Sequence, residues 1–462
     1  MDINMSTAKS QVVAAQLPWA VRVAAAFGAG MSASIACAGT VTTCVDSNVP
    51  GSGSLRAVVK AASNNETINL AALNCSQITL TLGAIPISVS NLTLQGPSAA
   101  HAPLIISGNL SYRVFFHSPF PLPDTGTLSI NNLTIADGKY DAFGTHAHGG
   151  CIYSSAAVEL TNSVVTDCHA NETGGGVNGE GARGGGIYAL GNVTLTNSTV
   201  SNSRAYSKDS GYSARGGGIV AANVSANFST ITGNSAVAGS AATSYAGGIE
   251  AGNVSITAST IDTNQADRGA GIYLFGDPSN PTVKSNIVNS TISANTAKSG
   301  VGGVAMSFQA SLNLLNSTIA FNRSTSGAGG LSLEIGNTLA MYSSIVAENS
   351  TVSGPAADLD ISHSSGVTGS HNLVMQTDYS PSGLIATTGN PRLVRLGFHG
   401  GITRTCAVQS FSPALEQGYL YTFLFDDQRG LGYERSVGFG PDIGAYERQD
   451  GDDEIFADSF DY

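Results

Sequence analysis

Charged residues are scarce in this chain. They make up 11% of the 462 residues, and lysine and arginine nowhere form a cluster. A nucleic-acid partner requires basic side chains gathered on one face, so the sparse charge and the formal net charge of -12 predict no nucleic-acid ligand. Cys-x-x-Cys and His-rich spacings are also missing, so we expect no metal site and no cofactor. No convincing amphipathic helix occurs between Thr67 and Met375, which excludes the common helical repeat folds.

The sequence does contain a repeat. Seven times two or three glycines closely precede an aliphatic residue, here called the glycine mark. A second aliphatic residue in a Ser/Thr-rich stretch, the serine mark, follows it. Successive repeats start 23 to 35 residues apart, a period typical of solenoids. The glycine marks are Ile152, Ile187, Ile219, Ile249, Ile272, Val304 and Leu331, and the serine marks are Val165, Val200, Ile231, Ile261, Ile292, Ile319 and Ile345.

Each repeat has the pattern strand, turn, strand, which suits one coil of a parallel β-helix. In that fold three short strands complete a circuit and the next coil stacks on top of it. We therefore expect an all-β protein, a monomer, built as a single-stranded right-handed parallel β-helix over residues 67–385. An N-terminal cap at residues 39–66, with a short helix around Leu55 to Ala62, should protect the first strand edge, and a second cap should protect the last.

The N-terminus has the features of an export signal. A short apolar run at residues 23–31 follows Lys9 and Arg22, and Ala36-Cys37-Ala38 has the form of a signal-peptidase site. We expect residues 1–38 to be a signal peptide, and the mature protein to be secreted or held at a cell surface. The apolar run is too short and too rich in glycine to span a bilayer, so no transmembrane helix is expected in the mature chain.

Removal of that segment leaves five cysteines for an oxidising compartment. Cys44 and Cys75 flank the first strand-like stretch and are the expected disulfide. Cys151 and Cys168 could be bridged if one coil brings them together, but the pairing of these two and of Cys406 is left open by the sequence.

Asparagine recurs three residues after the serine mark. Because equivalent residues of stacked coils lie one above another, these side chains should form a hydrogen-bonded ladder, which is a structural role. The glycines before each glycine mark are expected at a turn that needs positive φ or close backbone approach. The predicted ladder consists of Asn234, Asn264, Asn295 and Asn322.

Two sets of motifs resemble known families. Gly185-Gly186-Ile187 and the segment from Ile292 to Asn295 resemble the paired repeats of chlamydial polymorphic outer membrane proteins. Residues 386–447 resemble the choice-of-anchor Q domain of bacterial surface proteins, with Ile402 where that family usually has proline. This resemblance implies an exported β-helix similar to pectin-lyase-like solenoids, and it implies no known reaction. The carrying segments are Gly400-Gly401-Ile402-Thr403-Arg404-Thr405, Ser412-Pro413-Ala414-Leu415, Asp427-Gln428-Arg429-Gly430 and Asp442-Ile443-Gly444-Ala445-Tyr446-Glu447.

The linkers from a serine mark to the next glycine mark are longest in four consecutive repeats, and stacking should place them along one rim. Arg183, Arg215 and Arg268 occupy the same slot, four residues before a glycine mark, and Tyr245 fills it in the repeat between. Such a row could bind an acidic glycan, with arginines as bidentate donors and tyrosine as a stacking platform. Alternatively, these are solvated turn residues paired with Glu180, Asp209 and Asp267. The expected ligand-binding residues are Tyr140, His146, Arg183, Tyr206, Asp209, Tyr212, Arg215, Tyr245 and Arg268.

These observations favour a non-catalytic protein that binds or adheres to a polysaccharide or to a cell or matrix surface. The alternative is a polysaccharide lyase or glycoside hydrolase acting on acidic glycans, with His148, Arg183 or Arg215 as candidate base and with calcium as a possible cofactor. The coils contain no paired carboxylates of the kind that hydrolases use, and a purely structural spacer remains a third alternative. The acidic and aromatic tail, residues 448–462, is either a sorting signal or a frayed end.

Overall fold

The computed structural model describes residues 39–98, 103–119, 125–174, 180–208, 211–276, 283–353, 357–361, 366–378, 381–450 and 452. The expected signal peptide, Asp209 and most of the tail lie outside these residues. The described chain is nearly all β, and its parallel strands stack as a solenoid of about ten turns, which confirms the predicted fold class.

Each coil adds one strand to each of three faces, and equivalent strands of successive coils pair in parallel. The first face contains β4 (Ile85–Ile87), β7 (Phe115–His117), β12 (Ile152–Ser154), β17 (Ile187–Ala189), β22 (Ile219–Asn227), β25 (Ile249–Thr257), β28 (Ile272–Phe275), β32 (Val304–Ser307), β36 (Leu331–Leu333) and β40 (Leu359–Asp360). The second face contains β1 (Gly39–Thr40), β2 (Glu66–Asn69), β5 (Asn91–Gln95), β8 (Thr127–Asn131), β13 (Ala157–Thr161), β18 (Val193–Thr196), the second halves of β22 and β25, β29 (Ser285–Val288), β33 (Ser311–Leu315), β37 (Thr338–Tyr342), β41 (Val367–Val374) and β42 (Leu384–Thr387).

The third face contains β3 (Gln77–Thr79), β6 (Leu104–Ser107), β9 (Leu133–Ala136), β14 (Val164–Thr166), β19 (Thr199–Ser201), β23 (Thr230–Thr232), β26 (Thr260–Asp262), β30 (Thr291–Ser293), β34 (Thr318–Ala320) and β38 (Ile345–Ala347). A separate sheet contains β10 (Lys139–Ala142), β15 (His169–Glu172), β20 (Arg204–Ser207), β24 (Ser235–Val237), β27 (Gln265–Ala266), β31 (Thr296–Ala297), β35 (Arg323–Ser324) and β39 (Ser350–Thr351). Opposite its first strands lies a short sheet of β11 (Ala147–His148), β16 (Glu180–Arg183) and β21 (Ser213–Arg215).

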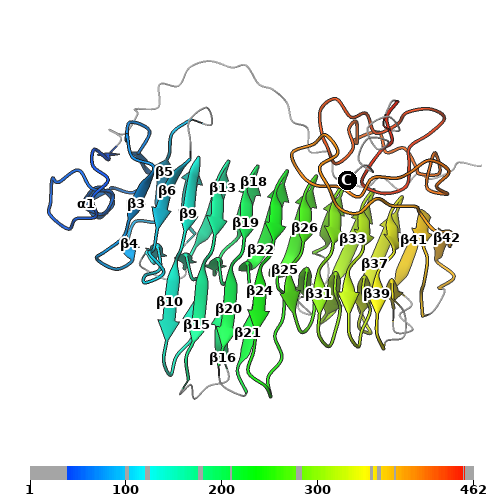
Figure 1. Ribbon diagram of the computed structural model, residues 1–462, viewed down its shortest axis with the longest axis horizontal. Coiled ribbons are helices and arrows are strands. Elements are labelled where there is room, and N and C mark those ends of the chain that lie inside the picture. The colour runs from blue at the N-terminus through cyan, green and yellow to red at the C-terminus, as the bar shows by residue number, and fades with distance from the viewer. Residues whose placement is uncertain are drawn as a thin grey trace, which may run out of the picture. The chain divides into compact units, whose positions relative to one another are not determined.

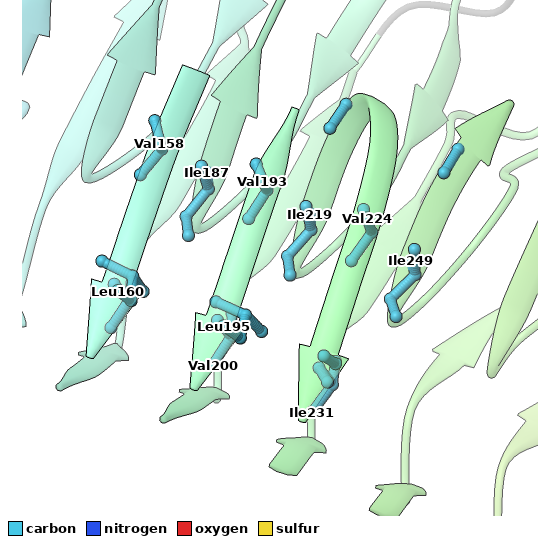
Figure 2. Close-up of a cluster of buried hydrophobic side chains, with 14 of the residues drawn as sticks. Val158, Leu160, Ile187, Val193, Leu195, Val200, Ile219, Val224, Ile231 and Ile249 are labelled. Atoms are coloured by element: carbon cyan, nitrogen blue, oxygen red, sulfur yellow. The ribbon is translucent and has the colours of Figure 1, made fainter. Parts of the chain in front are cut away.

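The glycine marks form the core of the solenoid. Ile187, Ile219 and Ile249 pair in register on the first face and are fully buried. Figure 2 shows them in line across successive coils, with the serine marks Val200 and Ile231 in a parallel line. Alternation along each strand directs these side chains inward, so one apolar interior runs through the stack.

The predicted asparagine ladder is present and is longer than expected. Asn264 donates its backbone N–H and its side-chain Nδ2 to Oδ1 of Asn295, both at 3.0 Å, and also donates Nδ2 to the carbonyl of Ile231 at 3.0 Å. Asn349 extends the series by one coil, and Asp358 ends it by accepting from Asn349 N and Nδ2 at 2.9 Å. The ladder residues are buried, so each bond is made away from water.

A second ladder, of serines, was not predicted. From Ser163 to Ser317, the backbone N–H of the serine two residues before a serine mark donates to Oγ of the serine in the next coil, as Ser229 does to Ser259 at 3.0 Å. The last acceptor is Ser344, because Val346 rather than the predicted mark Ile345 pairs in register with Ile319. The asparagine ladder explains the glycine directly before a glycine mark: at Gly218, a Cβ atom would lie 2.7 Å from the Gly248 carbonyl and 3.1 Å from Asn234 Nδ2. Glycine is therefore required there for close approach.

The cysteines fall into two bridges and one thiol among the described residues. Cys44 pairs with Cys75, as predicted, and Cys151 pairs with Cys168 across 17 residues of one coil. Cys406 is a free thiol buried beside Ser293, and burial raises its pKa to about 12.

The N-terminal cap contains the predicted helix, α1 (Leu55–Ala61). Ser54 caps it by accepting from the Ala57 N–H at 3.2 Å. Buried Arg56 joins the cap to the first coil, because it donates to Asp46 at 2.7 Å and to the Ala84 carbonyl at 2.8 Å. β1 already pairs with β2, so strand pairing begins before the helix rather than after it.

The C-terminal region, residues 386–447, folds back onto the third face. Figure 1 shows this orange and red segment over the later coils. Arg404 Nη2 donates to Asp262 of β26 at 2.6 Å, and Thr291 of β30 donates its hydroxyl to Gln428 at 2.5 Å. Ala445 N donates to Thr318 of β34 at 3.0 Å. The polar outer side of three consecutive coils is therefore covered by the chain itself.

Two buried arginines hold that region together. Arg429, whose side chain is 0% exposed, donates Nε and Nη2 to Asp427 at 3.0 and 2.8 Å and lies between the rings of Tyr433 and Tyr446. Arg435 donates to the carbonyls of Asp442 and Gly444 at 2.8 and 2.7 Å. The motif segments that resemble the choice-of-anchor Q domain thus have a structural role here, because they supply this network and the contacts to the coils.

The network predicts a pH dependence of stability. Burial raises the pKa of Glu447 to about 8, and Arg435 at 3.8 Å opposes the shift. The carboxyl therefore holds its proton more tightly in the folded protein than in the unfolded chain, so its contribution to stability is lost as pH rises from about 4.5 to 8. Thermal unfolding should show a decrease in melting temperature over this range that is smaller in Glu447→Gln. Equal pH slopes for the two proteins would contradict this prediction.

Candidate ligand-binding site

The slot that contains the arginines in sequence is a continuous column on consecutive coils. His148 pairs in register with Arg183, Arg183 with Arg215, Arg215 with Tyr245, and Tyr245 with Arg268. Neighbouring members are one inter-strand step apart, about 4.8 Å. We call these five residues the basic row. Arg183, Arg215 and Tyr245 are half-buried and Arg268 is exposed, so the row is accessible from solvent.

A second column, the inner row, lies one residue after each glycine mark on the first face. It contains Tyr153, Tyr188, Val220, Glu250 and Tyr273, paired in register. The two rows are in contact: the His148 ring stacks on Tyr188 at 4.1 Å, and Tyr245 meets Tyr273 edge to face at 5.1 Å. The sequence analysis missed this row, although its place beside the glycine mark was a signal that could have identified it.

Glu250 is the carboxylate of the site. It is 3% exposed, its Oε1 accepts from Arg215 Nη1 at 2.8 Å, and its buried Oε2 has no hydrogen-bond partner among the described residues. Burial raises the pKa of Glu250, and Arg215 and Arg183 oppose the shift. Burial alone would lower the pKa of Arg215, but Glu250 raises it overall. Arg215 is thus held in one orientation by a buried partner.

His148 is neutral at physiological pH. Burial, followed by the charges of Arg183, His146 and Arg113, lowers the pKa of His148 to about 3. Its ring also stacks on His146 at 5.3 Å. A general base works best when its pKa is close to the working pH, so this imidazole is poorly suited to catalysis. Its stacking between His146 and Tyr188 is a packing role.

Tyr140, one of the expected ligand-binding residues, packs against Arg113. The guanidinium of Arg113 lies over its ring at 3.9 Å, and Arg113 donates to the carbonyls of Gly149 and His148 at 2.8 and 2.5 Å. Burial lowers the pKa of Arg113 to about 10, which leaves it cationic at neutral pH. Tyr140 and Arg113 therefore support the backbone that carries His148.

The four long linkers form a two-layered extension, with β10, β15, β20 and β24 in one layer and β11, β16 and β21 in the other; Figure 1 shows the first four strands side by side. Alanines from both layers fill its interior, among them Ala205 of β20 and Ala182 of β16. Because side chains alternate along a strand, Tyr206 points away from the interior on one side and Arg183 on the other. Tyr206 instead packs under Arg204 at 4.4 Å.

The single rim expected from the sequence is thus two surfaces. Arg183, Arg215, Tyr245 and Arg268 share one of them, whereas Tyr206 lies on the other. Tyr212 is half-buried in the turn before β21, and Asp209 is outside the described residues. Of the acidic partners considered from the sequence, Asp267 accepts from the N–H and hydroxyl of Ser244 at 2.8 and 3.0 Å.

Within the described residues, no three or more histidine, cysteine, aspartate or glutamate side chains are grouped so as to hold a metal ion. No helix in the described part of the chain has the length and apolar character needed to cross a bilayer. The chain matches no protein-family model, no curated protein and no solved structure.

Proposed function

We propose that this protein binds an acidic polysaccharide, as a free polymer or on a cell or matrix surface, along the basic row. The observation that carries the proposal is the register of the row: Arg183, Arg215 and Arg268 occur on one side of the stack, with Tyr245 between them. A linear polymer laid along the stack meets one side chain of the row at each coil.

The chemistry of the row suits such a ligand. A guanidinium group offers paired N–H donors that match the two oxygens of a carboxylate. The half-buried ring of Tyr245 adds an apolar contact for a sugar ring. The chain as a whole has a formal net charge of -12, so these cations form a local exception on an acidic protein. Binding should therefore weaken as salt increases.

A lyase or hydrolase receives less support from this geometry. Beside the basic row, Glu250 is the one carboxylate among the described residues of the inner row, and the next carboxylate in that column, Asp360, lies four coils further on. A hydrolase of the usual kind needs two carboxylates on either side of the scissile bond. His148, a candidate base, has a pKa of about 3.

The proposal predicts a loss of binding when Arg183 and Arg215 are replaced together. Arg183→Ala with Arg215→Ala should weaken binding of polygalacturonate, measured by calorimetry at low salt, by roughly 100-fold, since each lost charge-assisted contact contributes about 1.5 kcal/mol.

A matched control removes the same charge elsewhere. Arg204 and Arg323 lie in one column of the separate sheet, and Arg204 is on the other side of the extension. Arg204→Ala with Arg323→Ala should bind as tightly as the natural protein. Equal losses in the two double variants would show that only overall charge matters, and no loss in either would remove the basic row as the site.

We also propose that the protein is an exported bacterial surface protein of the choice-of-anchor Q type. Two disulfides support an oxidising compartment, and the C-terminal motif segments support the anchor-type region. Fractionation of cells that express the chain with and without residues 1–38 tests this proposal, because only the full chain should leave the cytoplasm.

A further inference from the structure

The basic row ends at a hollow that the sequence itself creates. In the two coils after Arg268, the arginine slot is occupied by Gly300 and Gly327, four residues before the glycine marks Val304 and Leu331. A Cβ atom at position 300 would lie 2.6 Å from Arg268 Cγ, so the Arg268 side chain lies directly against Gly300. The slot therefore loses its side chains where the row stops.

The side chains of the inner row become smaller at the same place. Tyr273 is followed in register by Ala305, Ser332 and Asp360. Missing side chains in one column and small side chains in the next leave a hollow of about 160 Å³, here called the terminal pocket. Its lining includes Arg268, Tyr273, Ala305, Ser332, Glu334 and Asp360.

The charge of the terminal pocket is opposite to that of the row. Arg268 and Tyr273 form one end, and the carboxylates of Glu334 and Asp360 line the other, where Asp360 Oδ2 accepts from the Ser332 hydroxyl at 3.2 Å. Two carboxylates disfavour an anionic group and readily accept hydrogen bonds from hydroxyl groups. The volume is below the roughly 300 Å³ at which sites for drug-sized ligands begin, so one monosaccharide unit is the appropriate scale.

We propose that the terminal pocket binds one uncharged sugar unit, a hexose or N-acetylhexosamine, of the polysaccharide whose acidic units bind the basic row. This inference rests on the proposed function and narrows its ligand to a heteropolymer in which uronate and neutral units alternate. Gly300 follows Arg215 by three coils, or about 14 Å, so one extended chain reaches both.

The test compares two probes of equal charge, hyaluronan oligosaccharides, in which uronate and N-acetylhexosamine alternate, and oligogalacturonates, in which every unit is acidic. The natural protein should bind the alternating probe about 10-fold more tightly. Ser332→Leu fills the terminal pocket and should remove that preference, because it should weaken binding of hyaluronan oligosaccharides without changing binding of oligogalacturonates. Glu334→Lys should strengthen oligogalacturonate binding, whereas Glu159→Lys, at an exposed glutamate of the second face, should change neither affinity.

The outcomes separate the two proposals. If both probes bind equally, and neither Ser332→Leu nor Glu334→Lys alters their ratio, the pocket assignment is overturned while the basic row stands. If the natural protein binds neither probe, both proposals fall. Since Glu334 is exposed, its variant should fold normally and gives a result even if Ser332→Leu is unstable.

Discussion

Replacing Asn264 with alanine is expected to lower the free energy of unfolding by about 3 to 5 kcal/mol. The side chain accepts from the backbone N–H of Asn234 and donates to the Ile231 carbonyl, each at 3.0 Å in a fully buried setting. Alanine leaves both backbone groups without a hydrogen-bond partner, and each unsatisfied buried group lowers the free energy of unfolding by about 1 to 3 kcal/mol. Denaturant unfolding measures the loss, and faster hydrogen exchange at the Asn234 amide would locate it.

Asn253 provides the control, since it is an asparagine on the outer side of the second face. Its Nδ2 donates to Asn223 at 3.2 Å in an exposed setting. Asn253→Ala should change stability by less than about 0.5 kcal/mol, because water replaces the lost bond. Similar effects of the two replacements would mean that the buried ladder contributes no more than its exposed counterpart.

Replacing Arg429 with alanine should lower the free energy of unfolding by an amount similar to that expected for Asn264→Ala. It should also release the C-terminal region from the third face. The change leaves Asp427, whose carboxylate is also 0% exposed, buried without its cation. It also removes a donor from the His399 and Glu447 carbonyls. Breaking a buried pair by removing one partner costs about 3 to 5 kcal/mol. Limited proteolysis should then cleave residues 386–447 before the solenoid, which retains its own core.

A double variant separates charge from packing. Arg429→Met combined with Asp427→Asn removes both charges and keeps an acceptor at position 427, so it should be less destabilising than Arg429→Ala alone. Arg392→Ala, at an exposed arginine of the same region, should have no measurable effect. A double variant as unstable as the single one would show that packing between Tyr433 and Tyr446, rather than charge pairing, holds the region.

The repeating part of this structure was predictable because its signals are local and periodic. The core position of Ile219, the ladder position of Asn264 and the shared slot of Arg183 and Arg215 all follow from counting residues within a coil. Position along the coil sets orientation in a stacked fold, so a constant spacing becomes a column in space.

Features that depend on one coil alone were not predictable in this way. Glu250 occupies a position whose identity changes from coil to coil, so no repeat pointed to it. The contact of Arg404 with Asp262 joins residues 142 apart, and nothing in either segment indicates the other. The two-sided extension did leave a signal, the alternating alanines such as Ala182 and Ala205, which indicates a small interior between two layers.

A solenoid of equal layers can act as a molecular ruler. The coils between Arg215 and Gly300 set how far apart a bound chain must carry its acidic and its neutral groups. Duplication or loss of a single repeat in the gene would lengthen or shorten that distance by about 4.8 Å without changing any side chain at either end. Selectivity among polymers of different repeat length could thus evolve in discrete steps.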